Sequence, residues 1–270
     1  MNIILNEYSG YIKSKYNIYY RNYKSSNSRA SIICIHGILS DSRLFNNFAT
    51  ALVKYDYDVY AIDLPGYGLS EGEKGNVDFE YTIESIHDFI FSFNDKPFLL
   101  GFSLGTIYAI YYASRYKDIK GLILAASLFH PIRSELPEYA NRIYKLYQEN
   151  PEGKVNLLEC IHLDDDKYNY ILNDRLCNKE YKLAYLADIF IKATDATILE
   201  KVDCPVLILH GKYDAFTSIN QVKETYRLIA SKNKRLEILD TDHWLCNTFF
   251  YNGSKDSDVI NIIKEWLSSV

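Results

Sequence analysis

Short, nearly continuous apolar runs alternate along this 270-residue chain with longer segments whose apolar residues recur at helical spacing. Runs of this kind are typical of strands in a parallel sheet that helices cover on both faces. An antiparallel hairpin at the sheet edge is expected over 11–13 and 16–23. The pattern predicts an α/β fold with a mostly parallel central sheet of about eight strands flanked by helices. The further predicted strands are 31–36, 59–63, 98–102, 121–125, 206–210 and 236–239, and the predicted helices are 44–55, 79–93, 106–116, 218–230 and 258–267.

One region breaks this alternation. Residues 128–200 show no convincing strand pattern, and their apolar residues recur at helical spacing instead, as in 139–147. We therefore predict an all-helical insertion at 128–200, after the sixth strand, in a core domain formed by 1–127 and 201–270. Open α/β sheets bind ligands at the carboxyl ends of their strands, so this insertion is expected to be a cap over the site and not a surface decoration.

The composition narrows the class of protein. Hydrophobic residues make up 48% and charged residues 24% of the chain, as in ordinary globular proteins. The formal net charge of −5 argues against a nucleic-acid-binding surface, which usually requires a basic stripe. Residues 1–7 lack the features of a signal peptide, and no apolar run approaches the roughly 18 residues of a membrane span. We therefore expect a cytoplasmic protein without an integral membrane span.

The five cysteines are odd in number and widely scattered. Free thiols in a reducing compartment fit that distribution better than a disulfide framework does. Cys34-x-His36 and Cys160-x-His162 each lack the further ligands of a four-ligand zinc pattern. We therefore expect no metal site.

The segment Gly101-Phe102-Ser103-Leu104-Gly105 joins a predicted strand to a predicted helix. Its pattern, Gly-x-Ser-x-Gly, is typical of a strand–turn–helix bend that exposes a nucleophilic serine. Because so sharp a turn crowds the backbone, the positions two before and two after the serine need to lack a bulky Cβ. Ser103 is therefore the candidate nucleophile. A glycine-rich loop with an incidental serine stays open as the alternative on this pentapeptide alone.

A serine hydroxyl is too weakly acidic to attack an ester at neutral pH, so Ser103 needs a base and an acid that orients the base. Asp214 and His243 each follow a predicted strand, and the order Ser, Asp, His is expected for such a nucleophile on an α/β sheet. We therefore predict His243 as the base and Asp214 as the acid, with Asp195 as a more distant substitute. A plain turn-forming role is the alternative for Asp214.

The oxyanion that develops during acyl transfer needs backbone N–H donors. One donor is expected to be the amide of Leu104, directly after the nucleophile. The other is expected after the predicted strand 31–36, where His36-Gly37-Ile38 makes the amide of Ile38 the candidate. Only the backbone is needed, so the side chains at both positions are free to line an acyl pocket.

Together these motifs resemble the α/β-hydrolase superfamily over nearly the whole chain. The insertion and Gly68-Leu69-Ser70-Glu71-Gly72 resemble its monoacylglycerol lipase and lysophospholipase-like branch. The triple glycine of hormone-sensitive-lipase-like esterases is missing, and Asp242 stands where many relatives have glycine. Serine at 103, where dehalogenases and epoxide hydrolases of this fold carry aspartate, disfavours those reactions. The matching segments are His36-Gly37, Asp63-Leu64-Pro65-Gly66-Tyr67-Gly68-Leu69-Ser70, the Ser103 pentapeptide, His210-Gly211 with Asp214, and His243.

The resemblance implies a serine hydrolase that cleaves a small-molecule acyl ester, such as a monoacylglycerol or lysophospholipid, through an acyl-enzyme and without a cofactor. Two alternatives stay open. One is a carbon–carbon bond hydrolase or an aminopeptidase on the same fold. The other is a non-catalytic binding protein, against which the complete set of Ser103, Asp214 and His243 argues.

Overall fold

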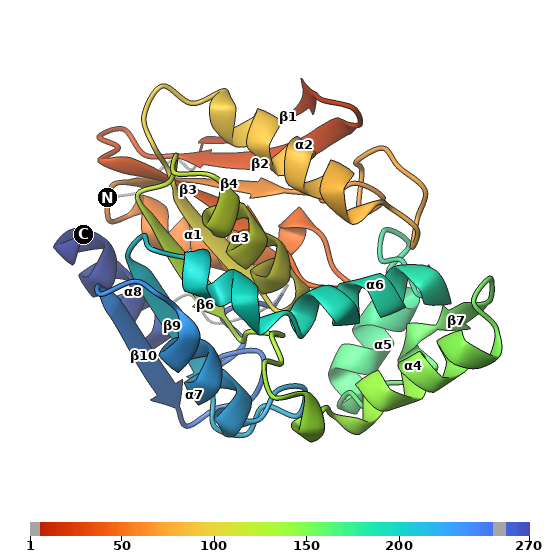
Figure 1. Ribbon diagram of the computed structural model, residues 1–270. Coiled ribbons are helices and arrows are strands. Elements are labelled where there is room, and N and C mark those ends of the chain that lie inside the picture. The colour runs from red at the N-terminus through yellow and green to blue at the C-terminus, as the bar shows by residue number, and fades with distance from the viewer. Residues whose placement is uncertain (1–5, 251–257) are drawn as a thin grey trace.

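The computed structural model describes residues 6–250 and 258–270 of the chain. The strands of its main sheet are β1 (Asn6–Lys13), β2 (Asn17–Lys24), β3 (Ala30–Ile35), β4 (Tyr57–Ile62), β5 (Phe98–Phe102), β6 (Gly121–Ala125), β9 (Val206–Gly211) and β10 (Lys234–Leu239). They lie in the order β1-β2-β4-β3-β5-β6-β9-β10 (Figure 1). β2 is antiparallel to both β1 and β4, and all other neighbours are parallel. The predicted fold class is confirmed.

Helices cover both faces of this sheet. They are α1 (Asn46–Val53), α2 (Phe79–Phe91), α3 (Leu104–Arg115), α7 (Ile219–Leu228) and α8 (Asp258–Ser269), and each overlaps a predicted helix. Buried side chains of α1 and α8 belong to one hydrophobic core, and those of α2, α3 and α7 belong to the other. The predicted helix 44–55 becomes regular only at α1 because a 3-10 turn, η1 (Ser42–Phe45), precedes it.

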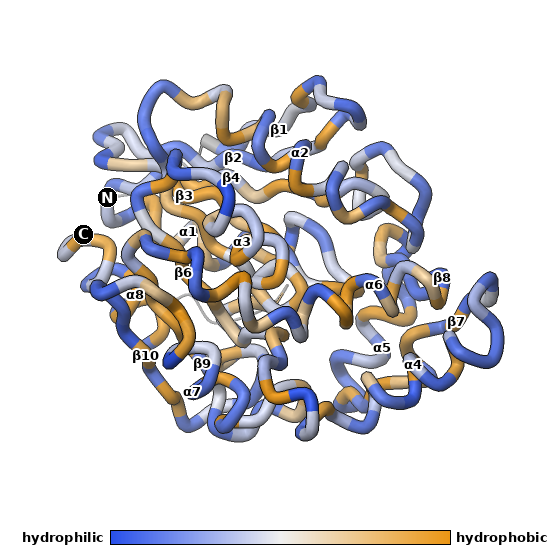
Figure 2. The backbone as a smooth tube through the Cα atoms, in the orientation of Figure 1, coloured by the Kyte–Doolittle hydropathy of each residue, from blue (hydrophilic) through white to orange (hydrophobic). Residues whose placement is uncertain are grey.

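The central strands are buried on both faces. Every residue of β5, β6 and β9 is buried, and Figure 2 shows the hydrophobic segments gathered in the middle of the molecule. Side chains alternate between the two faces of a strand. In β6, Leu122 and Leu124 therefore join the core under α2 and α3, whereas Ile123 and Ala125 join the core under α1 and α8. This double burial explains the continuous apolar runs of the sequence.

Residues 128–200, called the inserted segment below, follow β6 and precede β9. The prediction that this segment is all-helical is wrong in one respect, because β7 and β8 pair in an antiparallel two-stranded sheet. Each strand has only three residues, too few for an alternating pattern to be visible in the sequence. In Figure 1 the segment extends to the lower right of the main sheet. Its elements are α4 (Glu138–Glu149), β7 (Lys154–Asn156), α5 (Asp165–Asn173), β8 (Glu180–Lys182) and α6 (Leu183–Ala193), with 3-10 turns η2 (Arg133–Glu135), η3 (Leu157–Glu159) and η4 (Ala196–Lys201).

The prediction that 1–7 hold no signal peptide concerns a stretch of which 1–5 lie outside the described residues. Among the helices within 6–250 and 258–270, none combines the length and the apolar character that crossing a bilayer demands.

Candidate active site

Ser103 lies at the sharp turn between β5 and α3. Its backbone has φ 53° and ψ −120°, a conformation that a non-glycine residue adopts at a cost. The two glycines of the pentapeptide make the turn possible. A Cβ on Gly101 would lie 2.5 Å from the carbonyl oxygen of Gly105, and a Cβ on Gly105 would lie 2.2 Å from the carbonyl oxygen of Ile35. The predicted need for glycine at both positions is therefore a matter of backbone contact.

The structure brings Ser103, His243 and Asp214 together, although they are far apart in the sequence. His243 Nε2 lies 3.0 Å from Ser103 Oγ, and His243 Nδ1 lies 2.7 Å from Asp214 Oδ2. Ser103 and His243 are buried, and the Asp214 side chain is fully buried. The three residues stand in loops after β5, β9 and β10, whose carboxyl ends meet at one edge of the sheet.

The environment of Asp214 keeps its carboxylate charged. Asp214 Oδ1 accepts hydrogen bonds from the backbone N–H of Phe216 at 2.8 Å and of Thr217 at 3.1 Å. Burial by itself would raise the pKa of Asp214, but the imidazoles of His243 and His210 and the hydrogen bond from Phe216 outweigh burial and lower the pKa below its ordinary value. A carboxylate only accepts, so the hydrogen of His243 lies on Nδ1, and Nε2 is free to accept the Ser103 proton.

The loops that carry the acid and the histidine are packed directly on each other. A Cβ on Gly211 would lie 2.1 Å from the carbonyl oxygen of Asp242. The N–H of Tyr213 donates to the carbonyl of Thr241 at 2.9 Å. These backbone contacts set the spacing between Asp214 and His243. The Asp195 carboxylate is used elsewhere, because it accepts hydrogen bonds from the N–H and hydroxyl of Thr197, at 3.2 and 2.6 Å.

Ile38 and Leu104, the predicted oxyanion donors, line the same cavity as Ser103. Ser103 directly precedes Leu104, and a Cβ on Gly37 would stand 3.0 Å from Ser103 Cβ. Within the described part of the chain, neither amide has a hydrogen-bond acceptor. Their role as oxyanion donors stays a prediction.

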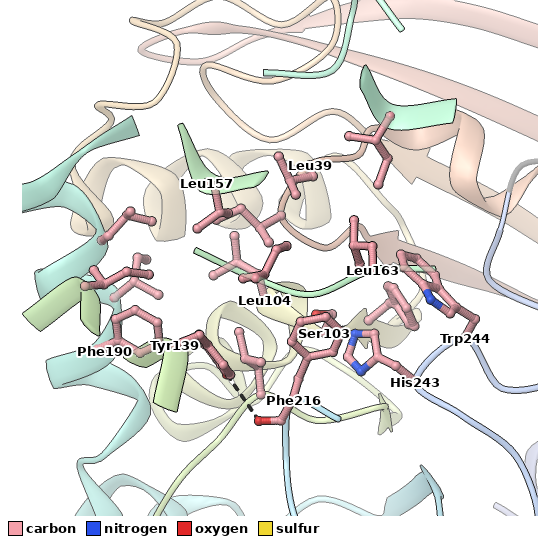
Figure 3. A pocket seen from close by; sticks show the side chains of 18 residues that line it. Leu39, Ser103, Leu104, Tyr139, Leu157, Leu163, Phe190, Phe216, His243 and Trp244 are labelled. Carbon is pink, nitrogen blue, oxygen red and sulfur yellow. Dashed lines mark hydrogen bonds between the residues drawn. The ribbon is translucent and has the colours of Figure 1, made fainter. Parts of the chain in front are cut away.

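A cavity opens beside Ser103 and His243 (Figure 3). Its empty space, with the open mouth included, is about 660 Å³. The inserted segment supplies much of the wall, including Ile143, Leu157 and Ile189. Apart from the serine and the imidazole, the wall within the described residues is aliphatic or aromatic and contains no carboxylate.

Two aromatic residues that were not predicted to belong to the site lie against this arrangement. The ring of Phe216 meets the His243 imidazole edge to face at 4.6 Å between centroids. The hydroxyl of Tyr139 in α4 donates to the carbonyl of Phe216 at 3.2 Å, as Figure 3 shows. Tyr139 belongs to the predicted helical pattern, but nothing in the sequence marks Phe216, which stands in a turn.

Comparison with known proteins gives three findings. The model of the family Hydrolase_4, described as serine aminopeptidase, S33, matches residues 26–243. A proline iminopeptidase of Saccharolobus solfataricus is 27% identical over 289 aligned positions, which cover 94% of this chain and 90% of that protein. A pimeloyl-(acyl-carrier protein) methyl ester esterase of Neisseria meningitidis is 27% identical over 232 positions, covering 77% of this chain and 84% of that protein.

Among solved structures, a soluble variant of the Saccharomyces cerevisiae monoglyceride lipase, in complex with a substrate analogue, has a similar fold. Its TM-score is 0.80 at 18% identity, with 97% of this chain and 95% of that chain covered. At this identity the likeness concerns the arrangement of the elements.

Proposed function

The chain belongs to the serine aminopeptidase S33 (Hydrolase_4) family, and from that premise we propose that it cleaves carboxylic esters with Ser103, His243 and Asp214. It is an α/β hydrolase. One observation carries the proposal: the hydrogen-bonded chain from Asp214 through His243 to Ser103 ends at an apolar cavity.

The reaction follows from the roles of these groups. His243 Nε2 accepts the proton of Ser103 Oγ as that oxygen attacks the ester carbonyl carbon. The amides of Ile38 and Leu104 stabilise the tetrahedral oxyanion. When the intermediate collapses, the carbon–oxygen bond to the alcohol breaks, His243 gives its proton to the leaving oxygen, and the acyl group stays on Ser103. Asp214 stabilises the imidazolium throughout.

The second half of the reaction repeats these steps with water. His243 takes a proton from a water molecule, whose oxygen attacks the acyl carbon. The second oxyanion collapses, the bond to Ser103 Oγ breaks, and His243 returns the proton to the serine. The products are one alcohol and one carboxylic acid, and the enzyme is regenerated without a cofactor.

The wall of the cavity favours an ester with an apolar acyl group over an aminopeptidase substrate. An aminopeptidase has to bind a charged α-ammonium group close to its nucleophile, and burying such a charge without a partner is costly. Within the described residues no carboxylate lines the cavity, whereas Ile143, Leu157 and Ile189 offer contacts to a hydrocarbon chain. A monoacylglycerol or a lysophospholipid carries such a hydrocarbon chain and fits the apolar cavity. We propose that the inserted segment is the cap that covers the bound acyl chain.

Two relatives correspond to two of the possible reactions, ester hydrolysis and peptide hydrolysis. The name of the esterase relative describes action on a methyl ester, and the name of the proline iminopeptidase relative describes a peptidase. A carbon–carbon bond hydrolase uses the same fold on a diketone. Turnover of p-nitrophenyl esters from acetyl to palmitoyl, set against proline p-nitroanilide and a diketone, separates the three. We expect ester turnover that is greatest with long chains; preference for the anilide would reverse the assignment.

The nucleophile is tested with a fluorophosphonate probe. We expect the wild-type protein to be labelled and Ser103→Ala to stay unlabelled, with turnover lower by on the order of 10⁶-fold. Ser127→Ala is the matched control, because Ser127 is also fully buried but its hydroxyl lies 3.4 Å from Thr106 and not beside the imidazole. Equal labelling of the wild type and Ser103→Ala would remove Ser103 from the role.

A further inference from the structure

The carbonyl oxygen of Gly37 is held from two sides. His36 Nε2 accepts a hydrogen bond from the N–H of Leu64 at 3.0 Å, so the hydrogen of this imidazole lies on Nδ1. Nδ1 is 2.7 Å from the carbonyl oxygen of Gly37 and therefore donates to it. The hydroxyl of Ser40 donates to the same oxygen at 2.8 Å. The direction of this carbonyl is therefore set by two buried donors.

That carbonyl belongs to the same peptide unit as the N–H of Ile38. In a planar trans peptide the C=O and the following N–H point in opposite directions. Fixing the Gly37 oxygen on His36 and Ser40 therefore fixes the direction of the Ile38 N–H as well. Rotation of this peptide would break both bonds and turn the Ile38 N–H away from its present direction.

The next peptide units are held by the inserted segment. Leu39 has a positive φ of 57°, which is strained for a leucine. Its N–H donates to the hydroxyl of Tyr181 in β8 at 3.3 Å, and its carbonyl lies 2.8 Å from Cys177 Sγ. Both polar groups of Leu39 are therefore bound by residues outside the core strands, and these contacts stabilise the strained conformation.

Tyr181 is itself firmly placed. It is fully buried, and its own hydroxyl donates to the carbonyl of Asn178 at 3.0 Å. The strand that carries it lies against the core, because a Cβ on Gly75 would stand 2.2 Å from the carbonyl oxygen of Glu180. The N–H of Lys182 donates to the carbonyl of Gly75 at 2.9 Å.

We propose that Ser40 and Tyr181 are positioning residues that together hold the Ile38 N–H toward the oxyanion, so that the inserted segment completes the oxyanion hole as well as covering the cavity. This inference rests on the proposed function, because it takes Ile38 as an oxyanion donor. It goes further in making catalysis depend on a contact between β8 and the loop after β3. Neither side chain lines the cavity, so neither is expected to contact the substrate.

Two pairs of variants test the proposal. Ser40→Ala removes one hydrogen bond to Gly37, and Ser42→Ala is its control, because the buried hydroxyl of Ser42 has no partner within the described residues. Tyr181→Phe removes the bond to Leu39. Its control is Tyr185→Phe, which loses a buried hydroxyl that is bonded to Tyr67 at 3.0 Å and that, within the described residues, makes no hydrogen bond to the loop after β3.

Three quantities are measured for each variant: the melting temperature, kcat and KM for a p-nitrophenyl ester, and the affinity of an alkyl boronic acid. A boronic acid forms a tetrahedral adduct with the serine and so places an oxygen where the oxyanion develops. We expect kcat to fall roughly 5- to 10-fold in Ser40→Ala and Tyr181→Phe, with KM within about twofold of the wild type. Boronic acid affinity should fall by the same factor.

The controls should keep both kcat and boronic acid affinity, whatever their melting temperatures. Wild-type values of kcat in both Ser40→Ala and Tyr181→Phe would overturn the proposal, and so would a lower kcat with unchanged boronic acid affinity. Failure of the proposed function is recognised separately. In that case the wild-type protein itself neither reacts with the fluorophosphonate probe nor turns over esters.

Discussion

Gly105 lies against the carbonyl oxygen of Ile35, which a Cβ at Gly105 would approach to 2.2 Å. This contact joins the first turn of α3 to the last residue of β3. Ser103 directly precedes α3, and the loop with Ile38 follows β3, so the contact helps to set the distance between the nucleophile and a proposed oxyanion donor. The absence of a side chain at Gly105 thus allows the two loops of the site to lie close together.

Gly105→Ala is expected to disturb both stability and catalysis. The added methyl group forces α3 and β3 apart, and overpacking of this kind costs about 1–3 kcal/mol of unfolding free energy. Displacement of the serine from the Ile38 amide is expected to lower kcat on the order of 10²-fold. Urea unfolding and ester turnover measure the two effects. The control is Gly10→Ala, whose Cβ would meet only the side chain of Tyr20, at 3.2 Å; equal behaviour of the two variants would contradict the prediction.

Asp214→Asn is expected to lower kcat by roughly 10⁴-fold with little change in fold, because an amide donor would favour the wrong tautomer of His243. Asp195→Asn is the matched control. Asp195 was the other candidate acid in the sequence, but its carboxylate binds Thr197. Steady-state kinetics of both variants decide between them. A severe loss in Asp195→Asn with an active Asp214→Asn would reverse the assignment.

His130 is expected to make the protein less stable in acid. Burial lowers the pKa of His130 to about 4, from an ordinary value of 6.5. Below pH 6.5 His130 binds a proton in the unfolded chain but stays neutral in the folded protein. This histidine therefore leaves the free energy of unfolding unchanged above pH 6.5 and lowers it increasingly as the pH falls toward 4. At about pH 4.5 the cost is roughly 2–3 kcal/mol.

The measurement compares urea unfolding at neutral pH and at about pH 4.5 in the wild type and in His130→Gln. Glutamine can still reach the hydroxyl of Tyr139, which lies 3.2 Å from His130 Nε2, but it does not titrate. We expect the variant to lose less stability between the two pH values. Identical losses would show that His130 is not responsible.

Ile189→Trp is expected to shorten the acyl chain that the cavity accepts. Ile189 is a buried residue of α6 that lines the cavity, whereas Ile191 in the same helix is 53% exposed. A tryptophan at 189 fills space needed by a long chain, so kcat/KM for palmitoyl esters should fall at least tenfold while acetyl esters change little. Ile191→Trp controls for the effect of the substitution on α6. A uniform loss over all chain lengths would point to misfolding in place of occlusion.

Much of the fold could be predicted because buried strands are visible in the sequence as apolar runs. Strands such as β5 and β6 are apolar throughout because both faces are covered, and their bounds match the prediction to the residue. The pair β7 and β8 could not be predicted in this way. Their pairing joins Val155 to Tyr181, and two three-residue strands leave no periodic pattern.

The candidate site likewise has some residues that could be predicted from the sequence and others that could not. Ser103, Asp214 and His243 stand directly after strands, and parallel strands of one sheet end at one edge, so their order along the chain was sufficient to predict that they meet. The steric requirement at Gly101 is local, because its Cβ would meet the carbonyl oxygen of Gly105, whereas the requirement at Gly105 comes from Ile35 in the distant strand β3. The contacts made by Phe216 and Tyr181 could not be predicted from any local pattern, because each depends on a residue from a distant element.

The sequence by itself determined which residues could perform acyl transfer and on which architecture, because strand burial and turn sterics act within a few neighbouring residues. Only the tertiary structure decided the apolar wall of the cavity and the partners of the loop after β3. Those depend on how the inserted segment packs on the core, and packing between distant segments is set by the shapes of many side chains together and not by any local pattern.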